Sequence, residues 1–528
     1  MPVSDYGIII FMRKFLYFIV FMSGLVSLAV EFAASRLLGN YFGTSNLVWA
    51  SIVGLILIYL TAGYFIGGAW ADRSHKHETL YKILCWAALA VGLIPLASRP
   101  ILRLASEAFD QLSLGVLFGS FTVVMVLFII PVTLIGTASP FAIRLAITDT
   151  AQAGKISGRI YAISTLGSFL GTFLPTLILV PTIGTYRTFL VLSSLLLVSA
   201  LTGLLLTSGF KKSLRYLWMP LVIVALFIWG VPGTDKATSG LVYETESSYN
   251  YIQVLEQDDY YLLRLNEGQG VHSVYKEDQL NFNGPWELVI AAPFFNESPV
   301  KPQDITDIAI IGLAAGTTAR EAAAVFPNAV IDGIEIDPKI VEAGRKYFDM
   351  NEPNLNVIIQ DGRWAIEKST KQYDIISVDA YRPPYIPWHM TTREFFQILS
   401  DHLKDDGVMV INVGRGVDDR RLIDALYSTI HSVFPTLYVS DLSDSFNTIL
   451  FATKSETSLD NFLENYIQLY NDSETPPFIL DVMSTTYDGL QETTGSDIVY
   501  TDDLAPVESI TNSMVMRFLF AGDVEILQ

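Results

Sequence analysis

Seven long apolar stretches in the first half of the chain constrain its fold more than any other feature. Each has about 18 to 25 residues, enough for an α-helix to cross the roughly 30 Å hydrocarbon core of a bilayer. They lie near 15–38, 47–71, 80–98, 112–136, 158–183, 188–208 and 215–232. The first is long, is followed directly by the second and offers no convincing small-residue cleavage site, so it does not resemble a cleaved signal peptide. The sequence therefore predicts a multi-pass α-helical membrane domain over residues 1–232.

Small residues and prolines inside these stretches predict a tightly packed bundle with local irregularities. The glycines that permit close helix approach are Gly63, Gly67, Gly68, Gly167 and Gly171. The prolines that can kink or interrupt a helix are Pro131, Pro140 and Pro175.

An acidic residue, Glu31, lies inside the first predicted span. A carboxylate there is costly unless it is paired or faces a cavity, and Arg36 follows little more than one turn later as a candidate partner. Two interpretations stay open, a transport or binding site and a structural polar contact between helices.

The charge balance differs sharply between the two halves. Residues up to Pro232 hold 15 Lys and Arg and 7 Asp and Glu, whereas the rest hold 19 and 47, so the net charges are +8 and −28. An acidic second half argues against a nucleic-acid partner and fits cationic substrates. The single cysteine, Cys85, excludes a disulfide framework and Cys-based metal sites, and we expect no metal.

Strands and helices alternate along the second half. A short β-rich segment over 241–290 predicts a small β-sheet module. Over 303–455 apolar strands alternate with helices, which predicts a mainly parallel, Rossmann-type α/β sheet covered on both faces. Residues 456–528 form a polar, mixed C-terminal tail in this interpretation.

Residues typical of a nucleoside site follow four predicted strands. The first strand leads into Gly312, Ala314 and Gly316, which let the backbone approach a ligand at a helix N-terminus. The second ends at Glu335, an acid placed to accept both hydroxyls of a ribose. The third ends at Asp361 and Gly362, where an acceptor can take an adenine amino hydrogen, and the fourth ends at Asp379. Ligands in such sheets bind beyond the C-terminal strand ends, so these residues predict one site.

These motifs resemble the spermidine synthase family, whose nucleoside domain is similar to class I methyltransferases and carries a small β-sheet in front. The resemblance rests on Tyr249 to Val254, Gly312 to Glu321, Ile334 to Pro338, Asp361-Gly362 and Tyr373 to Asp379. With the apolar first half, including Glu31, the chain resembles membrane-fused spermidine synthase-like proteins. The resemblance implies an aminopropyltransferase that uses decarboxylated S-adenosylmethionine and a small-molecule amine. It also implies that Glu335 holds the ribose, Asp361 the adenine, and Asp379 is the catalytic acid.

The chemistry agrees with that role for Asp379. A primary amine has a free pKa near 10.4, so it arrives protonated and cannot attack the carbon beside a sulfonium until it loses a proton. A carboxylate can orient the ammonium and help to remove that proton.

Two positions depart from the family pattern and keep a second reaction open. Ala315 stands where the family has an acid, and Arg382 stands where it has a second acid after the catalytic one. A site that has an arginine at 382 and no acid at 315 suits a ligand with a carboxylate, such as ordinary S-adenosylmethionine. The alternative function is therefore a membrane-tethered methyltransferase. The residues expected on the substrate side are Gln269, His272, Trp286, Tyr381 and Arg382, with His389 as a further candidate.

The distribution of basic residues predicts how the chain is oriented in the membrane. Eleven Lys and Arg lie in loops on the N-terminal side of the predicted spans and five on the other, which places the N-terminus in the cytoplasm and, with seven spans, the acidic half outside. The donor nucleoside is expected in the cytosol, so we expect a cell-membrane protein with a cytosolic catalytic domain and one segment, near 115–144 or 214–231, that does not span.

Membrane lipid is an expected partner, and a homodimer stays open. A third interpretation is a transporter or sensor that binds a nucleoside or polyamine without chemistry.

Overall fold

The computed structural model describes residues 3–42, 46–111, 115–147, 149–230, 236, 238–266, 270–381, 386–416, 419–443, 445–511 and 513–514. The chain divides into two compact units. One comprises Met1–Thr238 with Glu246–Ser248, and the other Ser239–Thr245 with Tyr249–Gln528.

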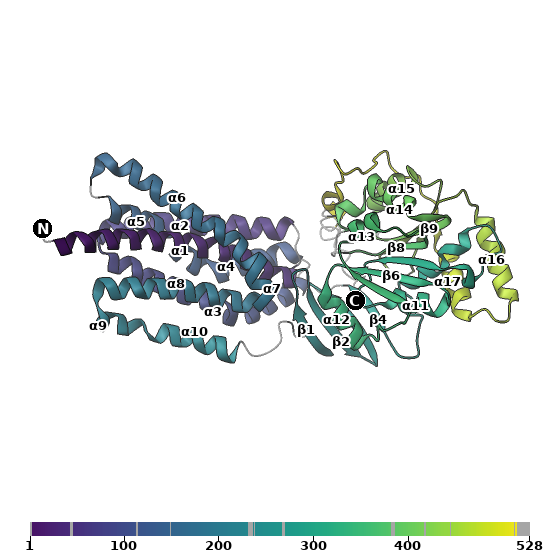
Figure 1. Ribbon diagram of the computed structural model, residues 1–528, viewed down its shortest axis with the longest axis horizontal. Helices are drawn as coiled ribbons and strands as arrows, with labels where there is room; N and C mark the ends of the chain where they lie inside the picture. The colour runs from purple at the N-terminus through teal and green to yellow at the C-terminus, as the bar shows by residue number, and fades with distance from the viewer. Residues whose placement is uncertain are drawn as a thin grey trace. The chain divides into compact units, whose positions relative to one another are not determined.

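The first unit is a helical bundle (Figure 1). Its α-helices are α1 (Val3–Phe42), α2 (Asn46–Arg73), α3 (His77–Gln111), α4 (Gly115–Gly136), α5 (Ala138–Ala146), α6 (Ala153–Phe173), α7 (Val180–Ile183), α8 (Thr185–Ser208), α9 (Phe210–Ser213) and α10 (Trp218–Trp229). Among the described residues, seven helical segments are long and apolar enough to cross a membrane, as the sequence predicts. They correspond one by one to the seven apolar stretches.

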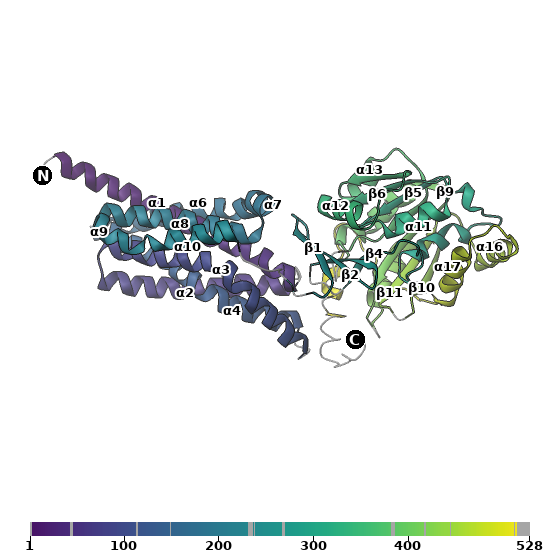
Figure 2. The same cartoon turned by 90° about the horizontal axis from the view of Figure 1, so that it is seen from below.

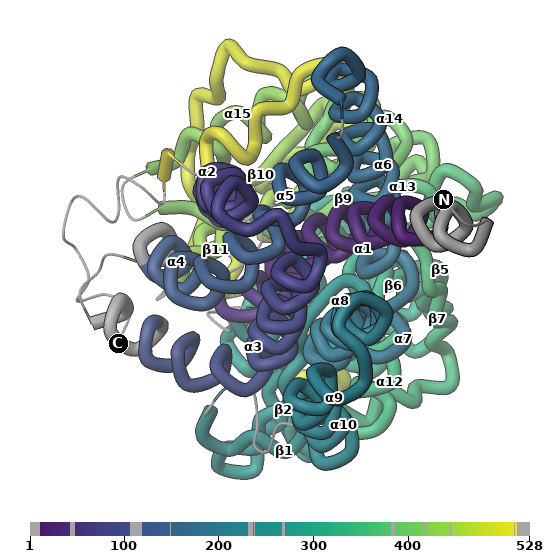
Figure 3. Tube along the Cα trace, turned by 90° about the vertical axis from the view of Figure 1, so that its left-hand side faces the viewer, coloured from purple at the N-terminus to yellow at the C-terminus, as the bar shows by residue number. Residues whose placement is uncertain are grey.

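Helix α1 is the central element of this bundle. It packs against α2, α3, α4, α5, α6 and α8, and the view along the bundle shows it among them (Figure 3). Its buried side chains include Val26, Ala29 and Val30, which are inaccessible to solvent. The polar residues Ser23, Ser27 and Glu31 of α1 are likewise buried inside the bundle.

Glycines allow α6 to approach α1 at backbone distance. A Cβ added at Gly167 would lie 2.1 Å from the carbonyl oxygen of Phe21, and one at Gly171 would lie 2.1 Å from that of Leu25. Gly63 approaches α4 in the same way, with Thr133 O at 2.4 Å, whereas nothing lies within 4 Å of a Cβ at Gly68. Larger residues at the first three positions would force these helices apart.

The proline at position 175 interrupts the regular helix, as the sequence predicts. Pro175 lies in a π-helical segment, η2 (Leu174–Leu179), that follows α6.

The candidate ion pair between Arg36 and Glu31 does not form. The Arg36 guanidinium instead donates to Ser247 O at 2.6 Å and lies 3.7 Å from the Glu246 carboxylate, both in the segment Glu246–Ser248 of the same unit.

The second unit contains two sheets. The small one has the order β1 (Leu241–Glu246), β2 (Tyr251–Gln257), β3 (Tyr260–Leu265) and β4 (Val271–Tyr275). The large one has the order β12-β10-β11-β9-β8-β5-β6-β7. Its strands are β5 (Asp307–Ile311), β6 (Val330–Glu335), β7 (Leu355–Ile359), β8 (Tyr373–Val378), β9 (Leu403–Gly414), β10 (Thr436–Asp441), β11 (Asn447–Thr453) and β12 (Leu490–Gln491). Strands β7, β6, β5, β8 and β9 are parallel, and the pairs among β9 to β12 are antiparallel.

Alternating side chains give the large sheet two apolar faces. Ile308 and Ile310 of β5 face one core, whereas Ala309 and Ile311 face the other. The first core is closed by η4 (Glu287–Phe295), α11 (Thr317–Val325), α16 (Leu459–Asn471) and α17 (Pro477–Asp488). The second is closed by α13 (Gly362–Lys368), α14 (Arg393–Asp401) and α15 (Arg421–His431), and α11 and α13 lie on opposite sides of the strands (Figure 2). Both faces are buried, as expected for a parallel sheet between helices.

The segment after residue 455, expected as a tail, is part of this core. Phe462 and Leu469 of α16 and Ile479 of α17 are buried with η4 and the sheet. The strand β12 then pairs with β10 at the sheet edge. The signal for α16 is the spacing of apolar residues at 459, 462, 466 and 469, which is typical of an amphipathic helix.

Candidate functional site

The sheet order brings the predicted strand ends together. Strands β8, β5, β6 and β7 are consecutive neighbours and all run parallel. Their C-terminal ends therefore meet at one edge, where Gly312, Glu335, Asp361 and Asp379 follow them. Helix α12 (Pro338–Tyr347) begins beside this edge, with Asp337 as its N-cap accepting from Lys339 N at 3.0 Å.

The glycine loop after β5 has a conformation that suits glycine. Gly312 has φ +88° and Gly316 has φ +95°, in the left-handed region, and a Cβ at Gly312 would lie 2.4 Å from Asp379 O. Between them Ala314 also has a positive φ, of 49°. The Gly312 N–H donates to Ile334 O at 2.9 Å, and the Asp379 N–H donates to Ile311 O at 2.8 Å. These contacts hold the loop between the ends of β6 and β8.

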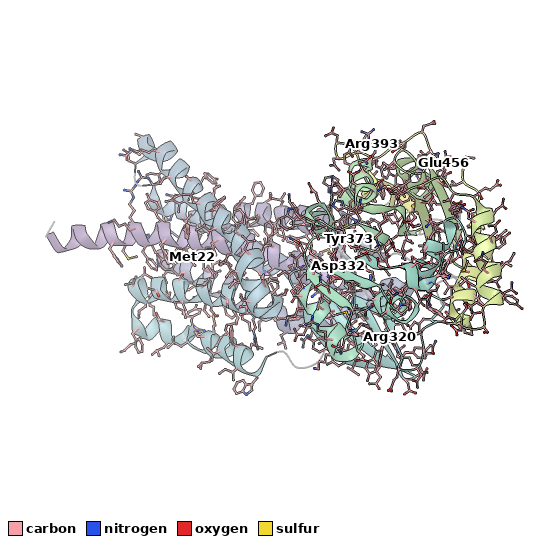
Figure 4. The ribbon with its side chains drawn as sticks, turned by 45° about the vertical axis from the view of Figure 1, so that its right-hand side comes forward. Met22, Arg320, Asp332, Tyr373, Arg393 and Glu456 are labelled. Atoms are coloured by element: carbon pink, nitrogen blue, oxygen red, sulfur yellow. The ribbon has the colours of Figure 1, made fainter. Side chains whose placement is uncertain are left out.

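The small sheet fixes the other side of the loop. The Ala315 N–H donates to Ser273 Oγ at 2.9 Å, and Thr317 Oγ1 donates to Val274 O at 2.9 Å. Arg320 of α11, labelled in Figure 4, donates to Lys276 O at 2.8 Å and covers the Tyr275 ring at 4.5 Å. Strand β4 is thus docked on the start of α11.

Glu335 is positioned by the backbone around it. Its carboxylate accepts from Ala314 N and from Asp337 N, both at 3.0 Å, and the residue is only 7% exposed. Burial outweighs these hydrogen bonds and raises the pKa of Glu335 to about 7. Each carboxylate oxygen accepts one backbone hydrogen bond and keeps capacity for another, which is what a ribose with two hydroxyls requires.

Asp361 has a structural contact as well as its predicted role. Its carboxylate caps α13 by accepting from Trp364 N at 3.0 Å, and it lies 3.2 Å from His389 Nε2. His389, expected on the acceptor side, thus contacts the residue predicted to hold adenine. Gly362 is packed closely, because a Cβ there would lie 2.3 Å from Ile311 Cγ2.

Asp379 has an asparagine partner that the sequence analysis missed. Asn412 Nδ2, from the neighbouring strand β9, donates to Asp379 Oδ1 at 3.0 Å. Burial raises the pKa of Asp379 to about 6, and the Asn412 hydrogen bond opposes this increase. The signal for Asn412 is a single amide within the apolar run Val408–Val413, and its neighbour β8 is set by the sheet order.

The orientation of the Asn412 amide leaves an acceptor without a partner. Because a carboxylate only accepts, the hydrogen bond to Asp379 assigns the NH₂ group and turns Oδ1 away. Asn412 Oδ1 is buried, and no described group donates to it. A buried acceptor without a donor is costly, so the pair Asp379 and Asn412 suits a ligand with N–H groups.

The other predicted substrate residues divide into two groups. The Tyr381 hydroxyl accepts from Gly414 N, so it lies at the ends of β8 and β9 with Asp379 and Asn412. His272 lies on β4 beside Ser273, and Trp286 precedes η4 and packs on Gly284. In the part of the chain that the structure describes, neither His272 nor Trp286 forms a hydrogen bond or ring contact with Asp379. Gln269 and Arg382 lie outside the described residues.

His272 has an environment that keeps it uncharged. Its Nε2 is buried without a partner among the described groups, and burial lowers its pKa to about 4.

Comparisons with known proteins identify relatives of the second half of the chain. Residues 296–446 match a family model described as the spermine/spermidine synthase domain. A probable polyamine aminopropyl transferase of Bifidobacterium longum is 33% identical over 284 residues, which are 51% of this chain and 62% of that protein. A polyamine aminopropyltransferase of Vibrio vulnificus is 30% identical over 209 residues, 38% of this chain and 67% of that protein. The chain therefore spans less than two thirds of the length of the first of these relatives.

Among solved structures, the spermidine synthase of Thermotoga maritima is similar with a TM-score of 0.39 and 22% identity. The match covers 47% of this chain and 84% of that one.

Proposed function

The chain belongs to the spermine/spermidine synthase family, and from this premise we propose that it transfers an aminopropyl group from decarboxylated S-adenosylmethionine to a small amine. The observation that carries the proposal is the pair of acceptors at the ends of β8 and β9, Asp379 and the unpartnered Asn412 Oδ1. A protonated amine has N–H groups for both. Catalysis also needs a donor nucleoside nearby, and we propose that it binds at the glycine loop that contacts Asp379.

The nucleoside is proposed to bind across the strand ends. Glu335 would accept from the ribose hydroxyls, Asp361 would accept from the adenine amino group, and the backbone from Gly312 to Gly316 and at Gly362 would form the walls. The residues fit this ligand because Glu335 is fixed by two backbone N–H groups while it keeps free acceptor capacity. The donor supplies a sulfonium, which makes the neighbouring carbon electrophilic and leaves as a neutral thioether.

In the proposed reaction, Asp379 acts on the acceptor amine. Its carboxylate and Asn412 Oδ1 orient the ammonium, and the carboxylate takes one proton so that the nitrogen lone pair becomes available. The nitrogen then forms a bond to the carbon while the carbon–sulfur bond breaks and its electron pair goes to sulfur. Holding both reactants in line contributes a large part of the rate, because the reaction becomes unimolecular in the bound state.

The first unit places this activity at a membrane in our proposal. Its seven apolar helices have the length and composition of membrane spans. We propose a multi-pass membrane enzyme whose second unit faces the cytosol, where the donor nucleoside is expected, with one of the seven segments, near 115–144 or 214–231, not crossing the bilayer.

The proposal is tested by the choice of donor. The purified full chain, supplied with putrescine, is expected to form a product larger by one aminopropyl group with decarboxylated S-adenosylmethionine, detected by mass spectrometry. Ordinary S-adenosylmethionine should give no methylated amine. Methyl transfer in place of aminopropyl transfer would replace this proposal with the methyltransferase alternative, and turnover of neither donor would contradict both.

The two raised carboxyl pKa values predict how the reaction responds to pH. Both Glu335 and Asp379 are needed ionised, and both titrate above their ordinary range, at about 7 and about 6. Function is therefore lost as pH falls through these values. Donor affinity should fall about tenfold per pH unit below 7, and turnover at saturating donor should fall in the same way below about 6. Calorimetry between pH 5 and 8 measures the decline in donor affinity, and steady-state rates measure the decline in turnover. Values that do not change with pH over that range would contradict the roles proposed for Glu335 and Asp379.

A further inference from the structure

A buried carboxyl group in the helical bundle has no role in the transfer reaction. Glu31 lies on α1, the central helix, and is only 7% exposed. Among the residues that the structure describes, none forms a hydrogen bond or ion pair with its carboxylate. Arg36, the nearest basic residue along the helix, is held by Ser247 and Glu246 instead. Glu31 therefore lacks the cation that a carboxylate at such a place requires.

Two serines extend this polar position along the same face of α1. Ser23, Ser27 and Glu31 are spaced by four residues, so their side chains follow one another along one side of the helix. Ser23 is 3% exposed and Ser27 is 6% exposed. The three side chains thus form a buried polar row, named here the α1 polar row.

The hydroxyl of Ser23 is unusual for a serine in an apolar helix. On α8, the hydroxyls of Ser194, Ser199 and Thr202 donate to the carbonyl four residues earlier, at 2.7–2.8 Å. This is the common way to satisfy such a group inside a membrane helix. Ser23 Oγ is buried and has no partner among the described groups. The α1 polar row therefore has an unsatisfied hydroxyl at Ser23 and a carboxylate without a cationic partner at Glu31.

The neighbouring helix changes its structure at the level of Glu31. Helix α6 runs parallel to α1, because Phe21 meets Gly167 and Leu25 meets Gly171. Continuing that register for about six residues brings Glu31 level with η2 (Leu174–Leu179), which contacts α1. A π-helical segment with a proline disrupts the regular carbonyl pairing and is frequent at functional sites.

We propose that the α1 polar row binds an alkyl diamine along its length, with Glu31 as the counter-ion of one ammonium group. Each step along the row rises about 6 Å, so one ammonium can donate to the Glu31 carboxylate and the Ser27 hydroxyl, and the other end of the diamine can reach Ser23. A hard metal ion would instead need about six oxygen ligands, more than one carboxylate and two hydroxyls provide. The site belongs to the helical bundle, so it is independent of the transfer site in the second unit.

The test is equilibrium binding of radiolabelled putrescine to the full chain in lipid nanodiscs. Glu31→Gln removes the negative charge at nearly constant size and is expected to abolish one class of binding site. The matched control is Glu78→Gln at the start of α3, whose carboxylate pairs with Lys82 and Lys212. Glu78→Gln should leave the number of sites unchanged. Aminopropyl transfer should be the same in both variants, which separates this proposal from the proposed function.

A second variant addresses the serines without touching the charge. Replacing Ser23 and Ser27 together by Ala is expected to weaken putrescine binding at the Glu31-dependent site about 3- to 10-fold, because two acceptors are lost. Equal numbers of sites and equal affinities in wild type, Glu31→Gln and the double serine variant would overturn the proposal. The same conclusion holds if wild type has no site that depends on Glu31.

Discussion

Asp379→Asn is expected to lower turnover by roughly 10²–10⁴-fold while donor affinity changes little, the usual range for removal of a general base. Asparagine keeps the size of the side chain and can still bond to Asn412, but it cannot take a proton from an ammonium. Its amide is also neutral, so it orients the cation less strongly. The measurements are kcat for aminopropyl transfer and the dissociation constant of the decarboxylated donor.

Two comparisons make this prediction specific. Asp405→Asn changes an exposed aspartate at the opposite end of the same sheet region, on β9, and is expected to have no effect on kcat. The rival explanation is that Asp379 only stabilises the turn after β8. Asparagine serves almost as well in such turns, so near-normal transfer by Asp379→Asn would reject the catalytic role.

The strand ends of the large sheet could be predicted because two independent patterns agree there. The apolar run Asp307–Ile311 and its neighbours mark buried parallel strands, and the polar residues that follow them mark the ends. Since parallel strands end at the same edge, sequence alone places Gly312, Glu335 and Asp379 near one another. The structure has these residues on β5, β6 and β8, three consecutive neighbours in the sheet.

Asn412 could not be assigned in the same way. Its contact with Asp379 requires β9 to lie next to β8. The order of strands in a sheet depends on how the connecting helices pack, which the local sequence does not specify. A lone amide in an apolar strand is a weak signal, because it is also compatible with an exposed sheet edge. Only the sheet order converts that amide into the partner of a carboxylate.

Contacts between residues far apart in the sequence explain the other differences between the sequence-based predictions and the structure. Closeness along one helix makes Arg36 a candidate partner of Glu31, yet its actual partners are more than 200 residues away in the sequence. The segment after residue 455 was expected as a tail because its composition is polar. Its apolar residues instead complete the core on the face closed by η4, which a composition argument does not detect.

Glu335→Gln is expected to weaken donor binding by about 1.5–3 kcal/mol, or roughly 10- to 150-fold, because a neutral amide replaces a carboxylate that accepts charge-assisted hydrogen bonds from the ribose. The amide NH₂ group would also face one of the two backbone N–H groups, at Ala314 or Asp337, that now donate to the carboxylate. Calorimetry with the decarboxylated donor measures the loss. Glu342→Gln on the exposed side of α12 is the matched control, since the Glu342 carboxylate forms an ion pair with Lys339 at the surface of the helix.

The pH dependence gives this variant a readout that a general loss of stability would not produce. In wild type, donor affinity should decline below pH 7 because Glu335 becomes protonated. Glutamine does not titrate, so the limb assigned to Glu335 should disappear in Glu335→Gln, while the decline of turnover below about pH 6 remains with Asp379. A variant that binds the donor weakly but keeps the wild-type pH profile would mean that another group titrates. In that case Glu335 only shapes the loop, and the ribose must be held elsewhere along the strand ends.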